Sequence, residues 1–369
     1  MSDITPVGYL VILAGAALLS LVLVPLALRV ALRLGALDHP GGHKQQPSAV
    51  PHLGGVAMVV AFAVAVLVAA LVRPPVAGLA QLATILGLAV AVSLVGLVDD
   101  LWGLSPWLRL VVVGAAAGGL WAAGVGTNLF GGGVLDLAVT VLWVVGVTNA
   151  INLLDNMDGL SAGVAAIAAV FFWLIAVLHG QFLVAALSLA LVGCAMGFLR
   201  HNFHPARIYM GDAGSLCLGF LLAVLGVKLE VPTDPVIAAF VPILVLGLAI
   251  FDTALVTVTR ITRGVSPFEG GRDHASHRLV ALGVPVPLAV GLLYLAATGL
   301  GWLGVIMARL QDLLTAYLLL GFTIVSLAGA GGLLALVRLA GDTSRATTLS
   351  SGWSDLADSP GTGPGNTRG

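Results

Sequence analysis

Eleven long apolar segments, separated by short polar loops, dominate the sequence. A helix needs about 20 apolar residues to cross the hydrocarbon core of a bilayer, and the segments reach or approach that length. Hydrophobic residues make up 59% of the chain and charged residues only 9%, too few to build a water-facing surface. The sequence therefore predicts an all-α polytopic membrane protein with about eleven transmembrane helices. The segments lie near 7–34, 52–72, 79–98, 108–125, 134–151, 161–179, 182–199, 213–228, 235–259, 284–308 and 313–340.

Two parts of the chain differ in composition. Residues 1–340 contain all of the apolar segments and form the predicted membrane domain. Residues 341–369 are rich in Gly, Ser, Thr and Pro and contain no long apolar run. Because such a segment cannot bury enough apolar surface to order itself, we predict a disordered tail after the last membrane helix.

Basic residues are distributed unevenly between the two sets of loops that alternate along the chain. One set, together with the tail, contains thirteen of the sixteen Lys and Arg residues. Because positive charge beside membrane helices marks the cytoplasmic side, we predict a protein of the cell membrane with its N-terminus outside and its tail inside. The loops of the predicted cytoplasmic set lie near 29–52, 98–109, 152–160, 200–212 and 260–283.

The predicted cytoplasmic loops also hold most of the side chains that could perform chemistry. Seven of the eight histidines, all except His179, lie there, together with most of the carboxylates. This distribution predicts an active site assembled from loops on one face. An ion-coupled transporter would place ionisable groups near the middle of the membrane, so transport is a remote alternative. The net charge of −1 provides no general basic field, and we expect no nucleic acid as a partner.

Two adjacent carboxylates end the third apolar segment, in LVGLVDDLWGLSP. Asp99 and Asp100 repel each other and lose hydration there, so a divalent cation or a cationic group is expected to compensate them. Negative charge at a helix C-terminus also opposes the helix dipole. A solvated helix end is the structural alternative, but the unfavourable position favours a functional role.

Four carboxamides and carboxylates follow the fifth segment, in TNAINLLDNMDGLSAG. Asn149, Asn152, Asp155 and Asp158 recur at every third position, which holds them near one side of a helix and of its end. Their oxygens suit a hard cation, a base edge or a ribose. A polar loop is the simpler alternative, but the regular spacing favours a binding site.

Asp212 stands just before the eighth segment, in NFHPARIYMGDAGSL. Backbone N–H groups at the start of the following helix could receive a phosphate while Asp212 holds a metal ion. An ordinary helix N-cap explains this residue equally well.

The loop before the tenth segment, SPFEGGRDHASHRLVALG, carries Arg272, His274 and His277. The two histidines are three residues apart, so they face the same way on a helical turn. A zinc site would need further ligands that the sequence does not offer, so we predict phosphate or substrate contacts, the alternative being a basic loop at anionic lipid. Asp252 is the one carboxylate predicted to lie within an apolar segment, and we interpret it as a support for this loop.

These motifs resemble those of the polyprenyl-phosphate N-acetylhexosamine-1-phosphate transferases, which belong to glycosyltransferase family 4. The resemblance extends from about residue 38 to 283 and rests on VDD at 98–100, TNAINLLDNMDGLSAG, IYMGDAGSLCLGF and SPFEGGRDHASHRL in that order. It implies a phosphotransferase that moves HexNAc-1-phosphate, with GlcNAc-1-phosphate favoured, from a UDP-sugar to a polyprenyl phosphate of the undecaprenyl or decaprenyl type. UMP would be released, and a lipid-linked cell-wall or surface glycan would be started.

The resemblance also implies roles for individual residues. Asp99 and Asp100 are implied to be catalytic, with Asp99 binding or deprotonating the lipid phosphate. Asn152 and Asp212 are implied to be ligands of Mg²⁺, for which Mn²⁺ is an alternative, and we include Asp212 among the catalytic residues. The residues expected to contact the substrates are Lys44, Asn149, Asp155, Asp158, Arg272, His274 and His277.

Departures from the family pattern bear on the substrate. The GlcNAc-type motif often reads Arg-Asp-His-x-His-His, and Ser276 occupies the position of the middle histidine. The three consecutive histidines typical of phospho-MurNAc-pentapeptide transferases are absent, which argues against that activity. We therefore keep it only as the alternative. Other HexNAc donors and a homodimer stay open. The first loop has His43-Lys44-Gln45-Gln46 where the family often has Arg-Lys-x-His, so the exact role of Lys44 is not assigned.

Overall fold

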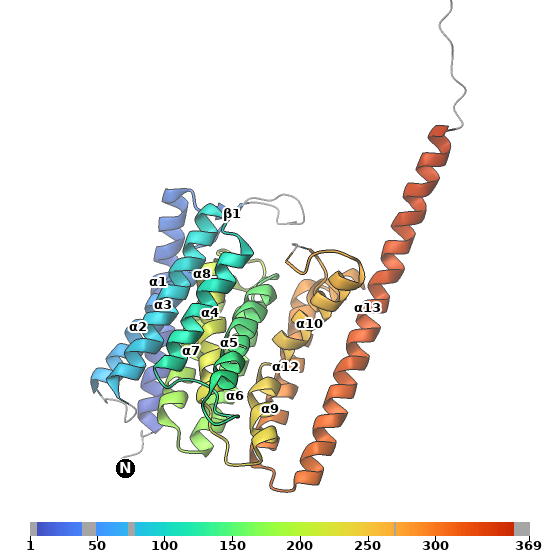
Figure 1. Ribbon diagram of the computed structural model, residues 1–369. Helices are drawn as coiled ribbons and strands as arrows, with labels where there is room; N and C mark the ends of the chain where they lie inside the picture. The colour runs from blue at the N-terminus through green and yellow to red at the C-terminus, as the bar shows by residue number, and fades with distance from the viewer. Residues whose placement is uncertain (1–5, 39–48, 73–77, 269–270, 358–369) are drawn as a thin grey trace, which may run out of the picture.

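The computed structural model describes residues 6–38, 49–72, 78–268 and 271–357. Within these ranges the chain is almost entirely helical (Figure 1), apart from one antiparallel pair of two-residue strands, β1 (Leu37–Asp38) and β2 (Val50–Pro51). The helices are α1 (Pro6–Leu34), α2 (Gly54–Val72), α3 (Leu79–Trp102), α4 (Pro106–Ala122), α5 (Val134–Leu154), α6 (Leu160–Leu178), α7 (Phe182–Asn202), α8 (Gly211–Lys228), α9 (Pro235–Val245), α10 (Gly247–Thr262), α11 (Ala275–Ala281), α12 (Val286–Arg309) and α13 (Leu313–Ala357).

Each of the eleven predicted apolar segments is helical. Nine helices of the described ranges are long and apolar enough to cross a membrane, and the bent pair α9 and α10 provides a tenth span if it counts as one. The remaining predicted segment, 108–125, corresponds to α4, which has 17 residues and is shorter than the nine long helices. The prediction of an all-α polytopic membrane protein is therefore confirmed.

The predicted segment 235–259 is not one straight helix. It consists of α9 and α10, whose axes differ by 78°. Pro242 lies inside α9 and cannot donate a backbone hydrogen bond, and Gly247, which has a low helix propensity, begins α10. These two residues on either side of the break weaken the helix there, and α10 leaves the direction of α9.

The last helix differs from the prediction for the tail. α13 continues to Ala357, whereas we predicted disorder from residue 341, and its end projects beyond the bundle (Figure 1). The first proline after residue 341 is Pro360, so no residue before it forbids a helix. The domain boundary at residue 340 stays a prediction, and residues 358–369 lie outside the described residues.

Glycines allow α2 and α3 to approach the start of α8 closely. A Cβ atom on Gly55 of α2 would lie 2.3 Å from the Cα of Gly214 in α8. A Cβ atom on Gly96 of α3 would lie 2.3 Å from the backbone oxygen of Asp212. Because no side chain fits at these distances, glycine is required where the three helices meet. This contact places the end of α3 beside Asp212.

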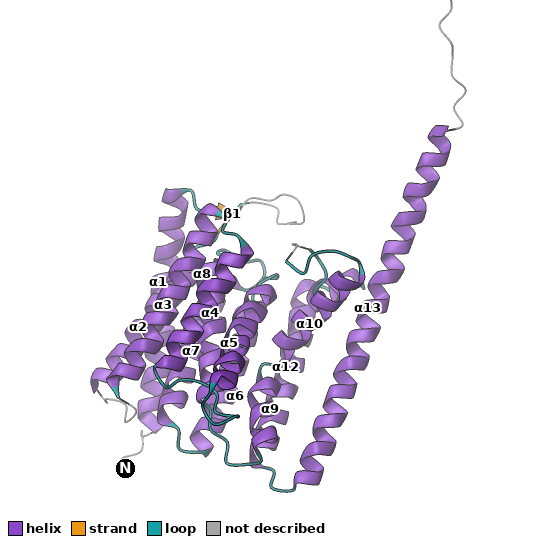
Figure 2. Ribbon diagram, in the orientation of Figure 1, coloured by secondary structure: helices purple, strands orange, loops and turns teal. Residues whose placement is uncertain are grey.

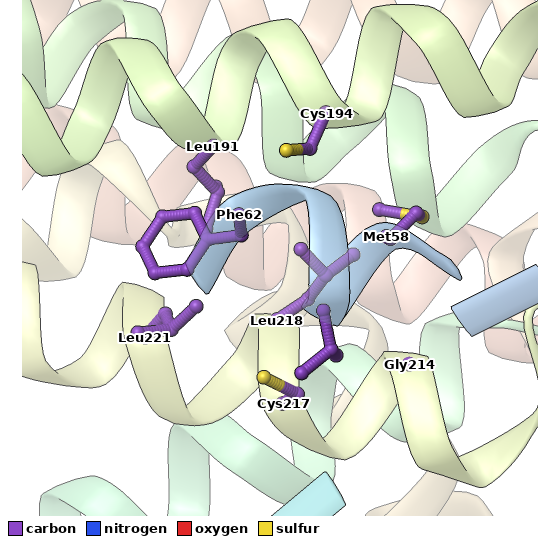
Figure 3. Close-up of a pocket in the computed structure, with 9 residues that line it drawn as sticks. Met58, Phe62, Leu191, Cys194, Gly214, Cys217, Leu218 and Leu221 are labelled. Atoms are coloured by element: carbon purple, nitrogen blue, oxygen red, sulfur yellow. The ribbon is translucent and has the colours of Figure 1, made fainter. Parts of the chain in front are cut away.

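A small apolar pocket lies between α2, α7 and α8 (Figure 3). Met58, Phe62, Cys194, Cys217 and Leu218 are among its lining residues. Both cysteines are free and buried. With no charged side chain in its lining, this pocket belongs to the core and does not suit a phosphate.

Candidate active site

The loops predicted to share one face do meet at one end of the bundle (Figure 2). We call this end the site face; it contains the C-termini of α3, α5 and α7 and the N-termini of α4, α6 and α8. The first loop pairs there with the segment before α8. The N–H of Tyr209 donates to Pro51 at 2.7 Å, and the N–H groups of Gly54 and Gly55 donate to Tyr209 and Met210 at 3.0 and 2.8 Å.

Two further contacts bring the segment between α10 and α12 to the same face. The ring of Phe268 packs against that of Trp107, which lies at the start of α4. The two ring centroids are 5.3 Å apart. The hydroxyl of Ser276 donates to Oδ1 of Asn156, in the loop after α5, at 2.6 Å. The prediction that distant loops assemble at one face is therefore confirmed.

Asp100 binds the start of α8. Its Oδ1 accepts a hydrogen bond from the N–H of Asp212 at 2.8 Å, and its Oδ2 accepts one from Ala213 at 3.0 Å. The first N–H groups of a helix have no partner within the helix and carry partial positive charge, so they stabilise a carboxylate. A helix N-terminus therefore supplies part of the compensation expected for Asp100. Asp100 occupies two of the N–H groups that could receive a phosphate, and a phosphate at this helix start stays a prediction.

Asp99 and Asp212 are joined by Arg109. One nitrogen of the guanidinium, Nη1, lies 2.7 Å from Oδ2 of Asp99 and 2.8 Å from Oδ2 of Asp212. The other oxygen of Asp99 accepts from the N–H of Leu104 at 2.6 Å. Sequence reasoning counted Arg109 only as a basic loop residue and missed this role. The available signal was its position in the first turn of α4, directly after the short loop that follows Asp99 and Asp100 at the end of α3.

The predicted metal ligands are adjacent in the structure. Nδ2 of Asn152, near the end of α5, donates to Oδ1 of Asp212 at 2.7 Å and to the hydroxyl of Ser215 at 2.9 Å. The close packing of α5 against α8 brings together residues that are 60 positions apart. We call Asp99, Asp100, Arg109, Asn152 and Asp212 the carboxylate cluster.

The donor set of the carboxylate cluster fits a hard divalent cation. The cluster holds three carboxylates and one guanidinium, which contacts two of them, so negative charge is in excess. Mg²⁺ prefers oxygen ligands and typically needs only one or two protein carboxylates, since water and substrate phosphates complete its coordination. The described residues include no group of three or more His, Cys, Asp or Glu side chains arranged for a metal ion. The carboxylate of Asp212 and the amide oxygen of Asn152 are the oxygen donors that could hold Mg²⁺, with the amide turned so that its oxygen faces the ion.

Asp155 adjoins the carboxylate cluster and ends α5. Burial, together with the negative charges of Asp212, Asp100 and Asp158, raises the pKa of its carboxyl group to about 8. Such a shift means that the ionised form lacks a compensating positive charge in its surroundings. A cation bound nearby would supply that charge and lower the pKa again.

The other two members of the predicted fourfold motif turn away from the cluster. Oδ2 of Asp158 accepts from Nδ1 of His204 at 2.8 Å and from the N–H of Ala206 at 3.0 Å, so Asp158 holds the loop after α7. Nδ2 of Asn149 donates to the carbonyl of Val145, one turn back in α5, at 2.8 Å. The structure therefore brings only Asn152 and Asp155 to the cluster, and substrate contacts of the other two stay predictions.

Asp252 supports the loop of residues 266–283, which we call the histidine loop, as we interpreted from the sequence. Its Oδ2 lies 2.7 Å from Nδ1 of His274, and its Oδ1 accepts from the N–H of Ala275 at 2.7 Å. His274 precedes α11, and its ring centroid lies 5.8 Å from that of His277. The two histidines are neighbours, as their spacing predicted.

Most arginines in or next to this loop form ion pairs or hydrogen bonds within the protein. Asp273 accepts from Arg260 at 3.2 Å and from Arg263 at 3.3 Å. Arg278 is buried, and its guanidinium donates to the carbonyl of Asp273 and to a carbonyl of α13. Arg272 differs, because its Nε is buried without a hydrogen-bond partner among the described residues.

Of the predicted substrate-binding residues, Lys44 lies outside the described residues.

Comparison with known proteins agrees with this geometry. The model for the family described as Glycosyl transferase family 4 matches residues 82–230, which contain the whole carboxylate cluster. A relative from Bacillus subtilis, named probable undecaprenyl-phosphate N-acetylglucosaminyl 1-phosphate transferase, is 31% identical over 284 residues, covering 74% of this chain and 78% of the relative. A decaprenyl-phosphate N-acetylglucosaminephosphotransferase from Mycolicibacterium smegmatis is 32% identical, with 75% of each chain covered.

A phospho-N-acetylmuramoyl-pentapeptide-transferase from Streptococcus pyogenes is 34% identical, but the match covers only 49% of this chain and 59% of the relative. The first two relatives are matched over about three quarters of both chains. The motifs quoted above, the helical architecture and these matches all agree. The chain belongs to glycosyl transferase family 4.

Proposed function

We propose that this protein transfers a HexNAc-1-phosphate, with GlcNAc-1-phosphate as the favoured group, from a UDP-sugar to a polyprenyl phosphate and releases UMP. The observation that carries the proposal is the carboxylate cluster, in which Arg109 joins Asp99 to Asp212 beside Asn152. The names of the two widely matched relatives support the polyprenyl-phosphate acceptor and the GlcNAc-1-phosphate group. The product would be the lipid-linked first sugar of a cell-wall or surface glycan.

The position of the cluster suits substrates of opposite solubility. A polyprenyl chain stays in the bilayer, whereas a nucleotide-sugar is dissolved in water, so the two phosphates can meet only at a membrane surface. The carboxylate cluster lies at the end of a bundle of apolar helices. We infer that the site face is cytoplasmic in the cell membrane and that the N-terminus lies outside, because the loops of that face carry most of the Lys and Arg residues.

The reaction is a phosphoryl transfer. An oxygen of the lipid phosphate attacks the β-phosphorus of the UDP-sugar, and the bond from that phosphorus to the oxygen bridging the α- and β-phosphates breaks. UMP leaves with the bridging oxygen, and the bond between the sugar and its phosphate stays intact. Mg²⁺ held by Asp212 and Asn152 would neutralise the diphosphate and stabilise the charge of the transition state.

The residues of the cluster then divide the remaining work. Asp99 binds or deprotonates the lipid phosphate, and Arg109, which contacts it, brings the one guanidinium close to the phosphate groups. Asp100 holds the start of α8, and with it Asp212, in place. Its contacts support a positioning role for Asp100, while its predicted direct part in catalysis is not needed to explain them.

The test is an assay of UMP release by the full-length protein in detergent. Undecaprenyl phosphate, Mg²⁺ and UDP-GlcNAc are supplied together, and then with each component left out. We expect release that requires all three and that EDTA and Asp212→Asn abolish. Release with UDP-MurNAc-pentapeptide alone would keep the reaction but change the donor. Folded protein that releases UMP from no UDP-sugar would contradict the proposal.

A further inference from the structure

A carboxylate and an imidazole form a buried pair outside the carboxylate cluster, between α10 and the start of α11. Asp252 is 2% exposed and His274 is 4% exposed. The 2.7 Å contact to Nδ1 of His274 and the 2.7 Å hydrogen bond from the N–H of Ala275 occupy one carboxylate oxygen each. Both oxygens of Asp252 are therefore bound to consecutive residues of the histidine loop.

The pair joins a membrane helix to the histidine loop. A carboxylate within a membrane helix is costly unless it has a partner. Asp252 lies on α10, beyond the 78° bend that separates this helix from α9. The histidine loop is also held from its other side, because Ser276 donates to Asn156, next to Asp155. The segment from His274 to Ser276 is thus held by Asp252 and, through Ser276, by the loop expected to contact the donor.

The contact with Asp252 determines which nitrogen of the imidazole is available. An ionised carboxylate can only accept, so a neutral imidazole that contacts it through Nδ1 carries its hydrogen on that nitrogen. Nε2 is then an acceptor. A nucleotide-sugar offers it hydroxyls, the N3–H of uracil and the acetamido N–H, and the hydroxyls are the most numerous of these donors. The ribose and the sugar both provide hydroxyls.

We propose that Asp252 is a positioning residue that holds His274 in the Nδ1-protonated form, so that Nε2 accepts a hydrogen bond from a hydroxyl of the nucleotide-sugar. The inference rests on the proposed function, since it assumes a nucleotide-sugar donor. It adds a role for a residue inside the membrane segment that does not touch the substrate. It also predicts a specific chemical consequence of replacing the carboxylate by an amide.

Asp252→Asn is the informative variant because it keeps size and reverses polarity at one atom. The amide oxygen can still accept from Ala275, and the NH₂ group then faces Nδ1 of His274. Nδ1 must become the acceptor, the ring hydrogen moves to Nε2, and the hydroxyl of the donor loses its acceptor. Thr253→Val is the matched control, because Thr253 is the next residue of α10 and its hydroxyl has no hydrogen-bond partner among the described residues.

The first measurement needs no substrate. In full-length protein labelled with ¹⁵N-histidine, the NMR shifts of His274, assigned by loss of its signals in His274→Gln, report which nitrogen carries the hydrogen. We expect Nδ1 in the wild type and in Thr253→Val, and Nε2 in Asp252→Asn. The same tautomer in all folded variants would overturn the inference, whatever the reaction of the enzyme is.

The second measurement is the binding of UDP-GlcNAc and of UMP by calorimetry. We expect Asp252→Asn and His274→Gln each to weaken UDP-GlcNAc binding roughly tenfold, and the double variant to be no weaker than His274→Gln alone. Equal losses for UMP would assign the hydroxyl to the ribose, and losses confined to UDP-GlcNAc would assign it to the sugar. Additive losses in the double variant would overturn the positioning role. No binding by the wild type would refute the proposed function, while the NMR result would still decide the tautomer.

Discussion

The carboxylate cluster and the histidine loop use charged residues in opposite ways. In the cluster, Arg109 is 23% exposed and Asp212 is 29% exposed at the side chain, and carboxylates outnumber the one guanidinium. At the histidine loop, Asp252 of α10 and Arg278 of the loop are each 2% exposed, and both are bonded to groups of the protein itself. Excess charge that solvent can reach indicates a site for a ligand, whereas charge that is matched and buried holds the structure. The variants below test this difference.

The largest effect is expected for Asp212→Asn, which removes a carboxylate that faces the proposed cation. We expect UMP release to fall roughly 1,000-fold while thermal unfolding changes little, because loss of charge stabilisation lowers the rate of phosphoryl transfer. Glu230→Gln serves as the control, since Glu230 is exposed away from the cluster. A loss of stability as large as the loss of activity would make Asp212 a structural residue.

Asp273→Asn should lower the stability of the protein and leave cation binding unchanged, the reverse of Asp212→Asn. This variant leaves Arg260, which is 3% exposed, without its charged partner. Breaking a buried ion pair on one side destabilises a protein by about 3 kcal/mol. We expect a lower unfolding temperature in detergent, with Mn²⁺ binding to the folded fraction unchanged. Weaker Mn²⁺ binding at unchanged stability would remove the distinction between the two regions.

Arg109→Gln examines the one positive charge of the cluster. Because Arg109 is partly exposed, we expect a smaller loss of activity, roughly 30-fold, than for Asp212→Asn. The rate of UMP release at saturating Mg²⁺ measures this loss. Arg109→Lys should recover part of the rate, because lysine restores the positive charge as a point charge. Full activity of Arg109→Gln would show that the bridge between Asp99 and Asp212 has no part in the reaction.

The pH dependence of cation binding is the last expected difference, and its size depends on the pH range that is compared. The pKa of Asp155 is raised to about 8, so its carboxyl is mostly protonated below that pH in the metal-free protein. Cation binding favours the ionised form and releases the proton, so Mn²⁺ affinity should rise between about pH 6 and pH 8, by up to about tenfold per pH unit. Asp155→Asn should flatten this dependence. An equally steep profile in the variant would assign the proton to another group.

Much of the fold could be predicted from the sequence because apolar run length is a local property. Segments such as 79–98 and 134–151 are apolar for long enough to be read directly as membrane helices. Alternation of the helices then required the loops to fall on two faces, and the contact of Phe268 with Trp107 agrees with that assignment. The bend after α9 could not be predicted, because a proline inside an apolar run does not by itself break a span.

The candidate site was predictable as a set of residues but not as a set of contacts. Asp99, Asn152 and Asp212 could be selected by their positions at the ends of apolar segments. Spacing by threes also suggested that Asn149 belongs with Asn152, yet its amide bonds back along α5. Local spacing places side chains on one side of a helix, but only the neighbouring helices determine which of them reach a common point.

By itself, the sequence determined that the chain is a bundle of membrane helices with reactive loops on one face, because hydrophobic length and charge distribution act over short stretches of chain. The tertiary structure alone decided that Asp100 binds the start of α8, 112 residues away, that Arg109 bridges Asp99 to Asp212, and that Asp252 holds His274. These pairings depend on how helices pack, which glycines such as Gly55 and Gly96 permit. Packing of this kind is a property of several segments together, and no single segment encodes it.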